Sequence, residues 1–222
     1  MINIAIDGPS GAGKSTAARA AAARLGYIYV DTGALYRAVG VAALRGNVQT
    51  DDPAAVQALL PALDIALRFE NGEQKVYLNG EDVSAAIRLP EASMAASNVS
   101  AVPAVRAFLL DLQKNLARSN NCLMDGRDIG TVVLPGAQLK IFLTASPEVR
   151  AERRYKELIG RGTPVEFSAL LEEIKQRDYN DSHRAIAPLK PAPDAVVLDS
   201  GGLTLEQVVD VIVALAKGLR HG

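Results

Sequence analysis

Residues 1–16 read MINIAIDGPSGAGKST, and this stretch decides the fold. The run that holds Ile2, Ile4 and Ile6 is apolar with few interruptions, which suits a buried parallel strand. Residues 8–15 match GxxxxGK[ST], the pattern of a phosphate-binding loop between a strand and a helix. An ordinary glycine-rich turn between a strand and a helix is the other reading. The complete pattern directly after an apolar run favours a loop that binds a polyphosphate.

The residue types in this loop explain how it would bind phosphate. Three glycines let the backbone turn tightly and bring its N–H groups close to an anion. Lys14 can reach the terminal phosphates, and the helix that begins there directs the positive end of its dipole at them. The fate of the phosphate depends on the rest of the chain.

The next segments predict a β-α-β-α opening. Lys14–Leu25 is rich in alanine and should be helical, with Gly26 as its stop. A short β-prone run at residues 27–30 leads into DTGALYR (31–37), and a second helix should extend to about Arg45. Ligands of open α/β sheets bind beyond the carboxyl ends of strands, so residues 31–37 should lie near the loop.

Residues 63–83 change character and predict an inserted subdomain. Asn71-Gly72 and Asn79-Gly80 bracket a β-prone run, which is typical of hairpins in a small antiparallel meander. Helices are expected on either side, at residues 51–60 and 90–99. Pro103 should start a longer helix at residues 104–118, whose apolar face carries Val105, Leu109, Leu112 and Leu116.

The second half of the chain returns to strands and helices that suit the main sheet. Strands are expected at residues 122–125, Leu139–Thr144 and 195–198. Helices are expected at residues 147–158, 166–181 and 204–219. No repeat or long linker marks a second independent domain.

Composition excludes several classes of function. The formal net charge of −1 gives no overall field that would attract nucleic acid or an anionic membrane. Cys122 is the sole cysteine, which rules out an intrachain disulfide and disfavours a zinc site. We expect no leader and no membrane span, because a basic n-region and a long apolar run are both missing. A cytoplasmic monomer is the expectation.

Asp125 and the two residues after Gly126 are candidates for chemistry. Asp125 ends an apolar strand and resembles the second acidic element of phosphate-loop proteins, which holds Mg²⁺ directly or through water. A carboxylate that only caps the turn is the alternative. Arg127 could grip a phosphate and Asp128 could accept a hydrogen bond from a base, although the two could also form a plain ion pair.

Arginine spacing is the second clue. Arg150, Arg153 and Arg154 share one helix face, and Arg161 follows between two glycines. Together they suit a mobile lid over transferring phosphates, whereas a solvated helix with its own ion pairs is the alternative.

The spacing of Arg177, Asp181 and Arg184 places them on one helical face. An ion-pair face is again the alternative, and Pro188 puts Arg184 near a helix end where it could meet a ligand.

The motifs taken together resemble the bacterial cytidylate kinase family over nearly the whole chain. They are GPSGAGKST (8–16), DTGALYR (31–37), GEDVSAAIR (80–88), DGRDIGTVVLP (125–135), RAERRYKEL (150–158) and RDYNDSHRAIAPL (177–189). The resemblance implies an α/β P-loop kinase with a central parallel five-stranded sheet flanked by helices, a small antiparallel β-containing insert and a helical lid. The core would cover about 1–45, 100–145 and 185–222, the insert about 50–99 and the lid about 147–184.

The resemblance also implies an activity and roles for individual residues. The activity is ATP-dependent phosphorylation of CMP and dCMP with Mg²⁺. ATP would be bound by Gly8, Pro9, Ser10, Gly11, Ala12, Gly13, Lys14, Ser15, Thr16, Arg153 and Arg161. CMP would be bound by Thr32, Tyr36, Arg37, Ser97, Arg106, Arg127, Asp128, Arg177, Asp181 and Arg184. The catalytic groups would be Lys14, Arg127, Arg184, Arg153 and Arg154.

Within this set, the resemblance assigns the acceptor phosphate to Arg37, Arg127 and Arg184. It assigns cytosine to Ser97, Arg106 and Asp128, and the sugar to Asp181. The metal would be held by Asp125 through water and by Ser15. Thr16 is a contender, because many nucleoside monophosphate kinases have Gly-Thr where this chain has Ser15-Thr16.

Other functions remain open at this point. A kinase for UMP, another nucleotide, shikimate or a sugar acid would share the phosphate-binding loop. A nucleotide-dependent regulatory protein would share it too, but would leave the arginines without a phosphorylated acceptor. A nucleic-acid enzyme is disfavoured by the near-neutral charge and the lack of an aromatic stacking set.

Overall fold

A computed structural model describes residues 1–70 and 73–219. Contacts divide the chain into two compact units, one made of Met1–Tyr29 with Asn120–Gly222 and the other of Val30–Ser119. The second unit contains the predicted insert and also the helices on either side of it. The division into core, insert and lid stays a prediction. The expected Asn71-Gly72 turn lies outside the described residues.

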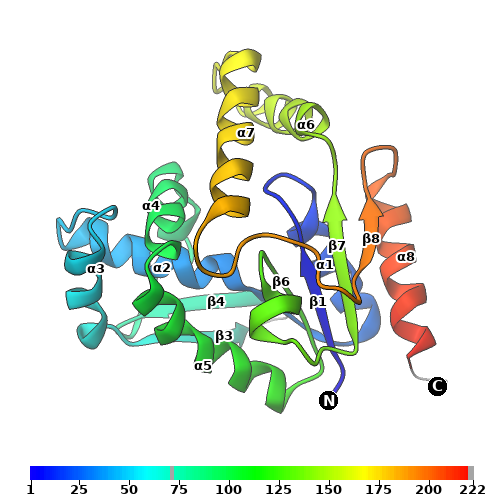
Figure 1. Ribbon diagram of the computed structural model, residues 1–222, viewed down its shortest axis with the longest axis horizontal. Helices are drawn as coiled ribbons and strands as arrows, with labels where there is room; N and C mark the ends of the chain where they lie inside the picture. The colour runs from blue at the N-terminus through cyan, green and yellow to red at the C-terminus, as the bar shows by residue number, and fades with distance from the viewer. Residues whose placement is uncertain (71–72, 220–222) are drawn as a thin grey trace. The chain divides into compact units, whose positions relative to one another are not determined.

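A five-stranded parallel sheet, in the order β2-β6-β1-β7-β8, forms the centre of the fold (Figure 1). The strands are β1 (Asn3–Asp7), β2 (Ile28–Asp31), β6 (Cys122–Gly126), β7 (Leu139–Thr144) and β8 (Val196–Asp199). All five were predicted, and the predicted fold class is confirmed. Central β1 pairs with β6 so that Asp7 lies opposite Gly126, which brings the carboxyl ends of these two strands together.

Helices α1 (Lys14–Leu25) and α8 (Leu205–Gly218) pack against each other beside this sheet. Gly26 ends α1 in the left-handed conformation, as predicted. Thr204 and Gln207 form a capping box that starts α8. The core between these elements is aliphatic and includes Ile6, Leu143 and Ile212. Cys122 is fully buried in β6.

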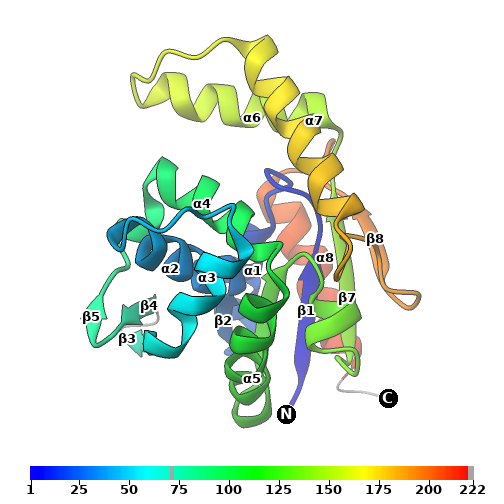
Figure 2. The same ribbon diagram turned by 60° about the vertical axis from the view of Figure 1, so that its left-hand side comes forward.

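Helices α6 (Pro147–Gly160) and α7 (Phe167–His183) lie side by side with a small core of their own (Figure 2). Ala151, Leu170 and Ile174 form its centre, and the rings of Tyr155 and Phe167 meet edge to face. These contacts are internal to the helical pair, which suits the prediction of a separate lid.

The end of α7 corrects one detail of the sequence analysis. The helix stops at His183, and Arg184 has extended backbone angles (φ −61°, ψ 142°). The prediction that Arg184 shares a helical face with Arg177 and Asp181 is therefore wrong. Its position at the helix end, which Pro188 indicated, is confirmed.

The unit Val30–Ser119 combines helices with the predicted meander. The helices are α2 (Thr32–Arg45), α3 (Pro53–Leu59), α4 (Pro90–Ser100) and α5 (Pro103–Ser119), with short 3₁₀ turns η1 (Leu60–Ala62) and η2 (Ala86–Arg88). The antiparallel strands are β3 (Ile65–Glu70), β4 (Glu73–Leu78) and β5 (Glu81–Asp82). Val105 and Leu109 of α5 are buried in the core of this unit, and Leu112 packs against it.

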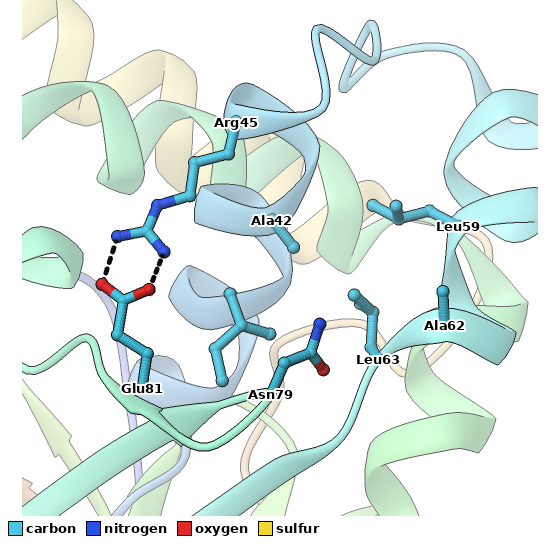
Figure 3. A pocket seen from close by; sticks show the side chains of 8 residues that line it. Ala42, Arg45, Leu59, Ala62, Leu63, Asn79 and Glu81 are labelled. Carbon is cyan, nitrogen blue, oxygen red and sulfur yellow. Dashed lines mark hydrogen bonds and ion pairs between the residues drawn. The ribbon is translucent and has the colours of Figure 1, made fainter.

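A pocket of about 260 Å³ lies in this unit beside the end of α2 (Figure 3). Leucine and alanine side chains line one side of it, and the Arg45–Glu81 ion pair, with N–O distances of 2.7 and 2.9 Å, lies at another. None of the residues predicted to bind nucleotide lines this pocket. It therefore does not mark the predicted site.

The described residues give no strong sign of a membrane span or a metal cluster. No single helix in residues 1–70 and 73–219 has the length and composition to cross a membrane, although α4 and α5, bent by 102°, would pass as a pair. The same residues contain no group of three or more His, Cys, Asp or Glu side chains that could hold a metal ion.

Candidate active site

The predicted phosphate-binding loop connects β1 to α1, as expected. Gly8 has a φ of +148°, and a Cβ built there would collide with the carbonyl oxygen of Leu143 in β7. A glycine is therefore required at this position for both conformation and space. Gly13, also in the left-handed region, is the N-cap of α1.

Lys14 lies in the first turn of α1 and is 5% exposed. Its Nζ donates a 2.6 Å hydrogen bond to the carbonyl oxygen of Pro9. Burial, together with the nearby Arg127 guanidinium, lowers the pKa of Lys14 well below its usual value. Two cationic side chains thus approach each other at the carboxyl ends of β1 and β6, where an anion would stabilise both.

The predicted metal ligands also come together. Asp125, at the end of β6, is 4% exposed and accepts hydrogen bonds from Ser15 Oγ at 2.8 Å and from the Tyr29 hydroxyl at 3.0 Å. A hydroxyl and a carboxylate in contact supply the oxygen ligands that Mg²⁺ prefers. The residues present therefore fit this ion. Of the two candidate hydroxyls, Ser15 and Thr16, it is Ser15 that contacts Asp125.

Arg127 and Asp181 form a second connected pair. Arg127 Nε donates to Asp181 Oδ2 at 2.8 Å, and Arg127 Nη1 donates to its neighbour Gly126. Burial by itself would raise the pKa of Asp181, but neighbouring guanidinium groups together outweigh it and hold that pKa below its usual value. Arg127 is the first of these groups, followed by Arg177 and Arg184. Asp181 is therefore a carboxylate that orients Arg127.

Asp128 and Arg184 lie in the same part of the molecule. Arg184 Nη2 is 3.4 Å from Asp128 Oδ1, and Arg184 Nε donates to the carbonyl oxygen of Ala187 at 2.6 Å. Arg177, which lies four residues before Asp181 on α7, adds positive charge near Asp181. The acceptor-side residues predicted in this unit thus form two ion pairs, and the charge of Arg184 also acts on Asp181.

Asp7 is a buried residue that the sequence analysis missed. Its carboxylate accepts the backbone N–H groups of Ile129 at 2.8 Å and Gly130 at 2.7 Å, at the start of the π-helical turn Ile129–Val133. Burial raises the pKa of Asp7 to about 6, although these two amides lower it. The sequence signal that could have indicated Asp7 is its position as the last residue of an apolar strand, directly before the phosphate-binding loop.

The arginines of α6 and its C-cap, Arg161, separate into two kinds. Arg150 and Arg153 bind backbone atoms of the same unit: Arg150 reaches Ser10, and Arg153 donates to the carbonyl oxygen of Ser200 at 2.6 Å. Arg154 and Arg161 instead pair with Glu157 at the exposed surface. The alternative of a solvated helix with its own ion pairs therefore describes the second kind and is wrong for Arg150, which is 2% exposed.

The predicted residues in the unit Val30–Ser119 lie on α2, α4 and α5. Thr32 is buried at the first position of α2, and the Arg37 side chain pairs with Asp31 at 2.6 Å. Among the described residues, the Nε of Arg37 is buried without a hydrogen-bond partner. A buried donor left unsatisfied costs about 1–3 kcal/mol, so this atom favours an anionic ligand.

The same unit brings together two of the residues predicted to bind CMP. The Arg106 guanidinium lies 5.6 Å from the centre of the Tyr36 ring and donates to the carbonyl oxygen of Ser100. Ser97 is half-buried in α4, and its carbonyl oxygen accepts a hydrogen bond from Ser100. These contacts hold Arg106 over the ring of Tyr36.

The sheet and the loop define the class of protein, an α/β P-loop kinase. A gluconokinase from Sinorhizobium meliloti has a similar fold, with a TM-score of 0.51 and 17% sequence identity, over 99% of this chain and 94% of that chain. Similarity at this level of identity concerns the fold alone.

Sequence similarity then identifies the family. The model of the cytidylate kinase family matches residues 4–218. Cytidylate kinases from Caldicellulosiruptor bescii and Ligilactobacillus salivarius are 51% identical over 214 residues and 49% identical over 220. These alignments cover 96% and 99% of this chain, and 95% and 98% of the two relatives. The chain belongs to the cytidylate kinase family.

Proposed function

We propose that the chain transfers the γ-phosphoryl group of ATP to CMP and dCMP, giving ADP and CDP or dCDP. The observation that carries this proposal is the pairing of β1 with β6, which places Asp7 opposite Gly126 at the carboxyl ends of the two strands. The phosphate-binding loop with its buried Lys14 follows β1, and Arg127 follows β6. Two adjacent cations suit the meeting of a donor phosphate and an acceptor phosphate.

The acceptor phosphate is proposed to bind Arg37, Arg127 and Arg184. Support comes from the unsatisfied Nε of Arg37 and from the carboxylates that orient the other two arginines. Planar guanidinium groups bind phosphate oxygens in pairs, so three of them would fix the direction of the attacking oxygen. Thr32, Tyr36, Arg177 and Asp181 are proposed to contact the rest of the nucleotide.

The reaction needs positioning and charge neutralisation more than acid–base chemistry. The acceptor phosphate is already ionised near neutral pH, so no general base is required. Its oxygen attacks the γ-phosphorus in line while the bond to the leaving ADP oxygen breaks. Lys14 and the proposed lid arginines Arg153, Arg154 and Arg161 oppose the negative charge that develops. Lid closure would exclude the water that could otherwise hydrolyse ATP.

Cytosine is proposed to be bound by Ser97, Arg106 and Asp128. The exocyclic amine of cytosine would donate to Asp128, whereas uracil would present an oxygen to the same carboxylate. An unpaired buried polar group costs about 1–3 kcal/mol, so CMP should be preferred over UMP by roughly ten- to a hundredfold.

We expect Asp128→Ala to remove most of this preference. The measurement is the ratio of kcat/KM for CMP to kcat/KM for UMP, with Asp210→Ala, an exposed aspartate of α8, as the matched control. A ratio that stays at the wild-type value in Asp128→Ala would remove Asp128 from base recognition.

Ser15 and Asp125 would hold the Mg²⁺ ion, which supplies charge neutralisation on the phosphate oxygens. We expect Ser15→Ala to raise the Mg²⁺ concentration for half-maximal rate by about tenfold or more. Thr16→Ala should change it little, because the hydroxyl that contacts Asp125 belongs to Ser15. The measurement is a Mg²⁺ titration of each variant at saturating ATP and CMP. A large rise in the half-maximal Mg²⁺ concentration in Thr16→Ala, with little change in Ser15→Ala, would assign the metal to Thr16.

A substrate panel tests the proposal as a whole. ADP release is measured with CMP, dCMP, UMP, AMP, GMP, shikimate and gluconate in turn, with ATP and Mg²⁺. Release with CMP and dCMP well above the others is expected. A preference for another acceptor would indicate a different kinase, and slow turnover with tightly held product would indicate a regulatory nucleotide-binding protein.

We propose the cytoplasm as the site of this reaction, a role in pyrimidine nucleotide metabolism, and a monomer as the active form.

A further inference from the structure

The carbonyl groups of the phosphate-binding loop are held by side chains from three places in the chain. The Pro9 carbonyl accepts from Lys14, the Ser10 carbonyl from Arg150 Nη1 at 3.0 Å, and the Ala12 carbonyl from Ser200 Oγ at 3.1 Å. In a trans peptide the carbonyl and the following N–H point in opposite directions. Fixing these carbonyls therefore fixes the N–H groups that would face a phosphate.

Arg150 is the most constrained of these donors. Its Nε donates to Ala145 at 2.9 Å, and its two terminal nitrogens bind both oxygens of Asp178 at 3.0 and 2.5 Å. Gly11 permits this approach, since a Cβ there would come within 3.2 Å of Arg150 Cβ. A buried guanidinium with both ends engaged has one orientation, which a lysine could not reproduce.

Asp178 connects this arginine to the acceptor side. It lies on α7, three residues before Asp181, so the two carboxylates are one helical turn apart. Asp181 in turn accepts from Arg127 Nε at 2.8 Å. A continuous path therefore runs from the Ser10 carbonyl through Arg150 to Asp178 by hydrogen bonds. One turn of α7 then leads to Asp181, which binds Arg127.

We infer that Arg150 and Asp178 are positioning residues that couple the ATP-binding loop to the acceptor-binding arginine, so that each nucleotide strengthens binding of the other. When phosphate orders the loop, the Ser10 carbonyl holds Arg150, and Asp178 then holds the turn of α7 that carries Asp181. Coupling of this kind is reciprocal, so ATP and CMP should raise each other's affinity by the same factor. The inference rests on the proposed function.

The test compares CMP binding with and without the β,γ-imido analogue of ATP by calorimetry. In the wild type the analogue should lower the Kd for CMP by about 5- to 150-fold. Asp178→Asn should lose most of that factor while CMP still binds in the absence of the analogue, and Asp178→Glu, which keeps the charge, should recover part of it. Glu172→Gln is the matched control, because Glu172 on α7 pairs only at the surface with Lys175.

Two results would overturn the inference. One is that the analogue leaves the Kd for CMP of the wild type unchanged, and the other is that it lowers the Kd of Asp178→Asn as much as that of the wild type. Hydrogen exchange on the wild type keeps the inference testable if the variant does not fold. The analogue alone should slow amide exchange across residues 177–184, and unchanged exchange there would also overturn the coupling. Failure of the proposed function is separate, because it would appear as an absence of CMP turnover in the wild type.

Discussion

Replacing Lys14 with methionine is expected to lower kcat/KM for CMP phosphorylation by about 10²–10³, the loss typical of removing one preorganised charge-stabilising donor. Lys14 is buried beside the phosphate-binding loop, where a charge acts at low dielectric and is little screened. Burial already lowers the pKa of this lysine, so its charge is unfavourable for folding. The variant should therefore keep or gain thermal stability while it loses activity.

Lys140→Met is the matched control for this experiment. Lys140 is also a buried lysine of the same unit, but it pairs with the exposed carboxylate of Asp194, at 2.8 Å. It should retain kcat/KM near the wild-type value. Less than about a tenfold loss in a well-folded Lys14→Met protein would mean that the lysine does not stabilise the transferred group.

Replacing Arg127 with methionine is expected to lower kcat/KM for CMP by about 10²–10³, with little change in the KM for ATP. The proposed phosphate contact would be lost, and Asp181 would keep a largely buried carboxylate without its cation. The pKa of Asp181 should rise, because burial raises it and Arg127 is the first of the three arginines that lower it. The variant should therefore be less stable than the wild type at neutral pH.

A second variant separates these two effects of Arg127. Arg127→Met combined with Asp181→Asn removes the unpaired carboxylate and should recover thermal stability without recovering activity. Arg24→Met, which breaks only an exposed ion pair with Asp210, serves as the control. Wild-type activity in Arg127→Met would exclude this arginine from acceptor binding, and an equal rise in both KM values would assign it to ATP as well.

Local sequence signals were sufficient for most of the elements. Gly26 ends α1 because it adopts positive φ, and Pro103 starts α5 because proline fits the first helical turn. The Asn79-Gly80 pair forms the turn before β5, and both residues have positive φ. Each of these effects acts over a few residues, so the pattern alone reveals it.

The features that were missed depend on contacts between distant residues. The π-helical turn Ile129–Val133 begins where two backbone amides donate to the carboxylate of Asp7. The first of these amides, that of Ile129, is 122 residues from Asp7 in the sequence. Arg150 looked like any other arginine on a charged helix, yet its guanidinium reaches a carbonyl 140 residues away. Spacing along one helix describes neighbours on that helix and carries no information about such partners.

The burial of Cys122 has a practical consequence for studying α6 and α7. It is the sole cysteine of the chain, and burial in β6 raises the pKa of its thiol to about 12. A thiol that does not ionise near neutral pH reacts slowly with alkylating reagents. The protein without any introduced cysteine should therefore take up little thiol-reactive dye. A cysteine introduced at the exposed Lys156 position of α6 would carry a single dye and follow the motion of this helix in solution.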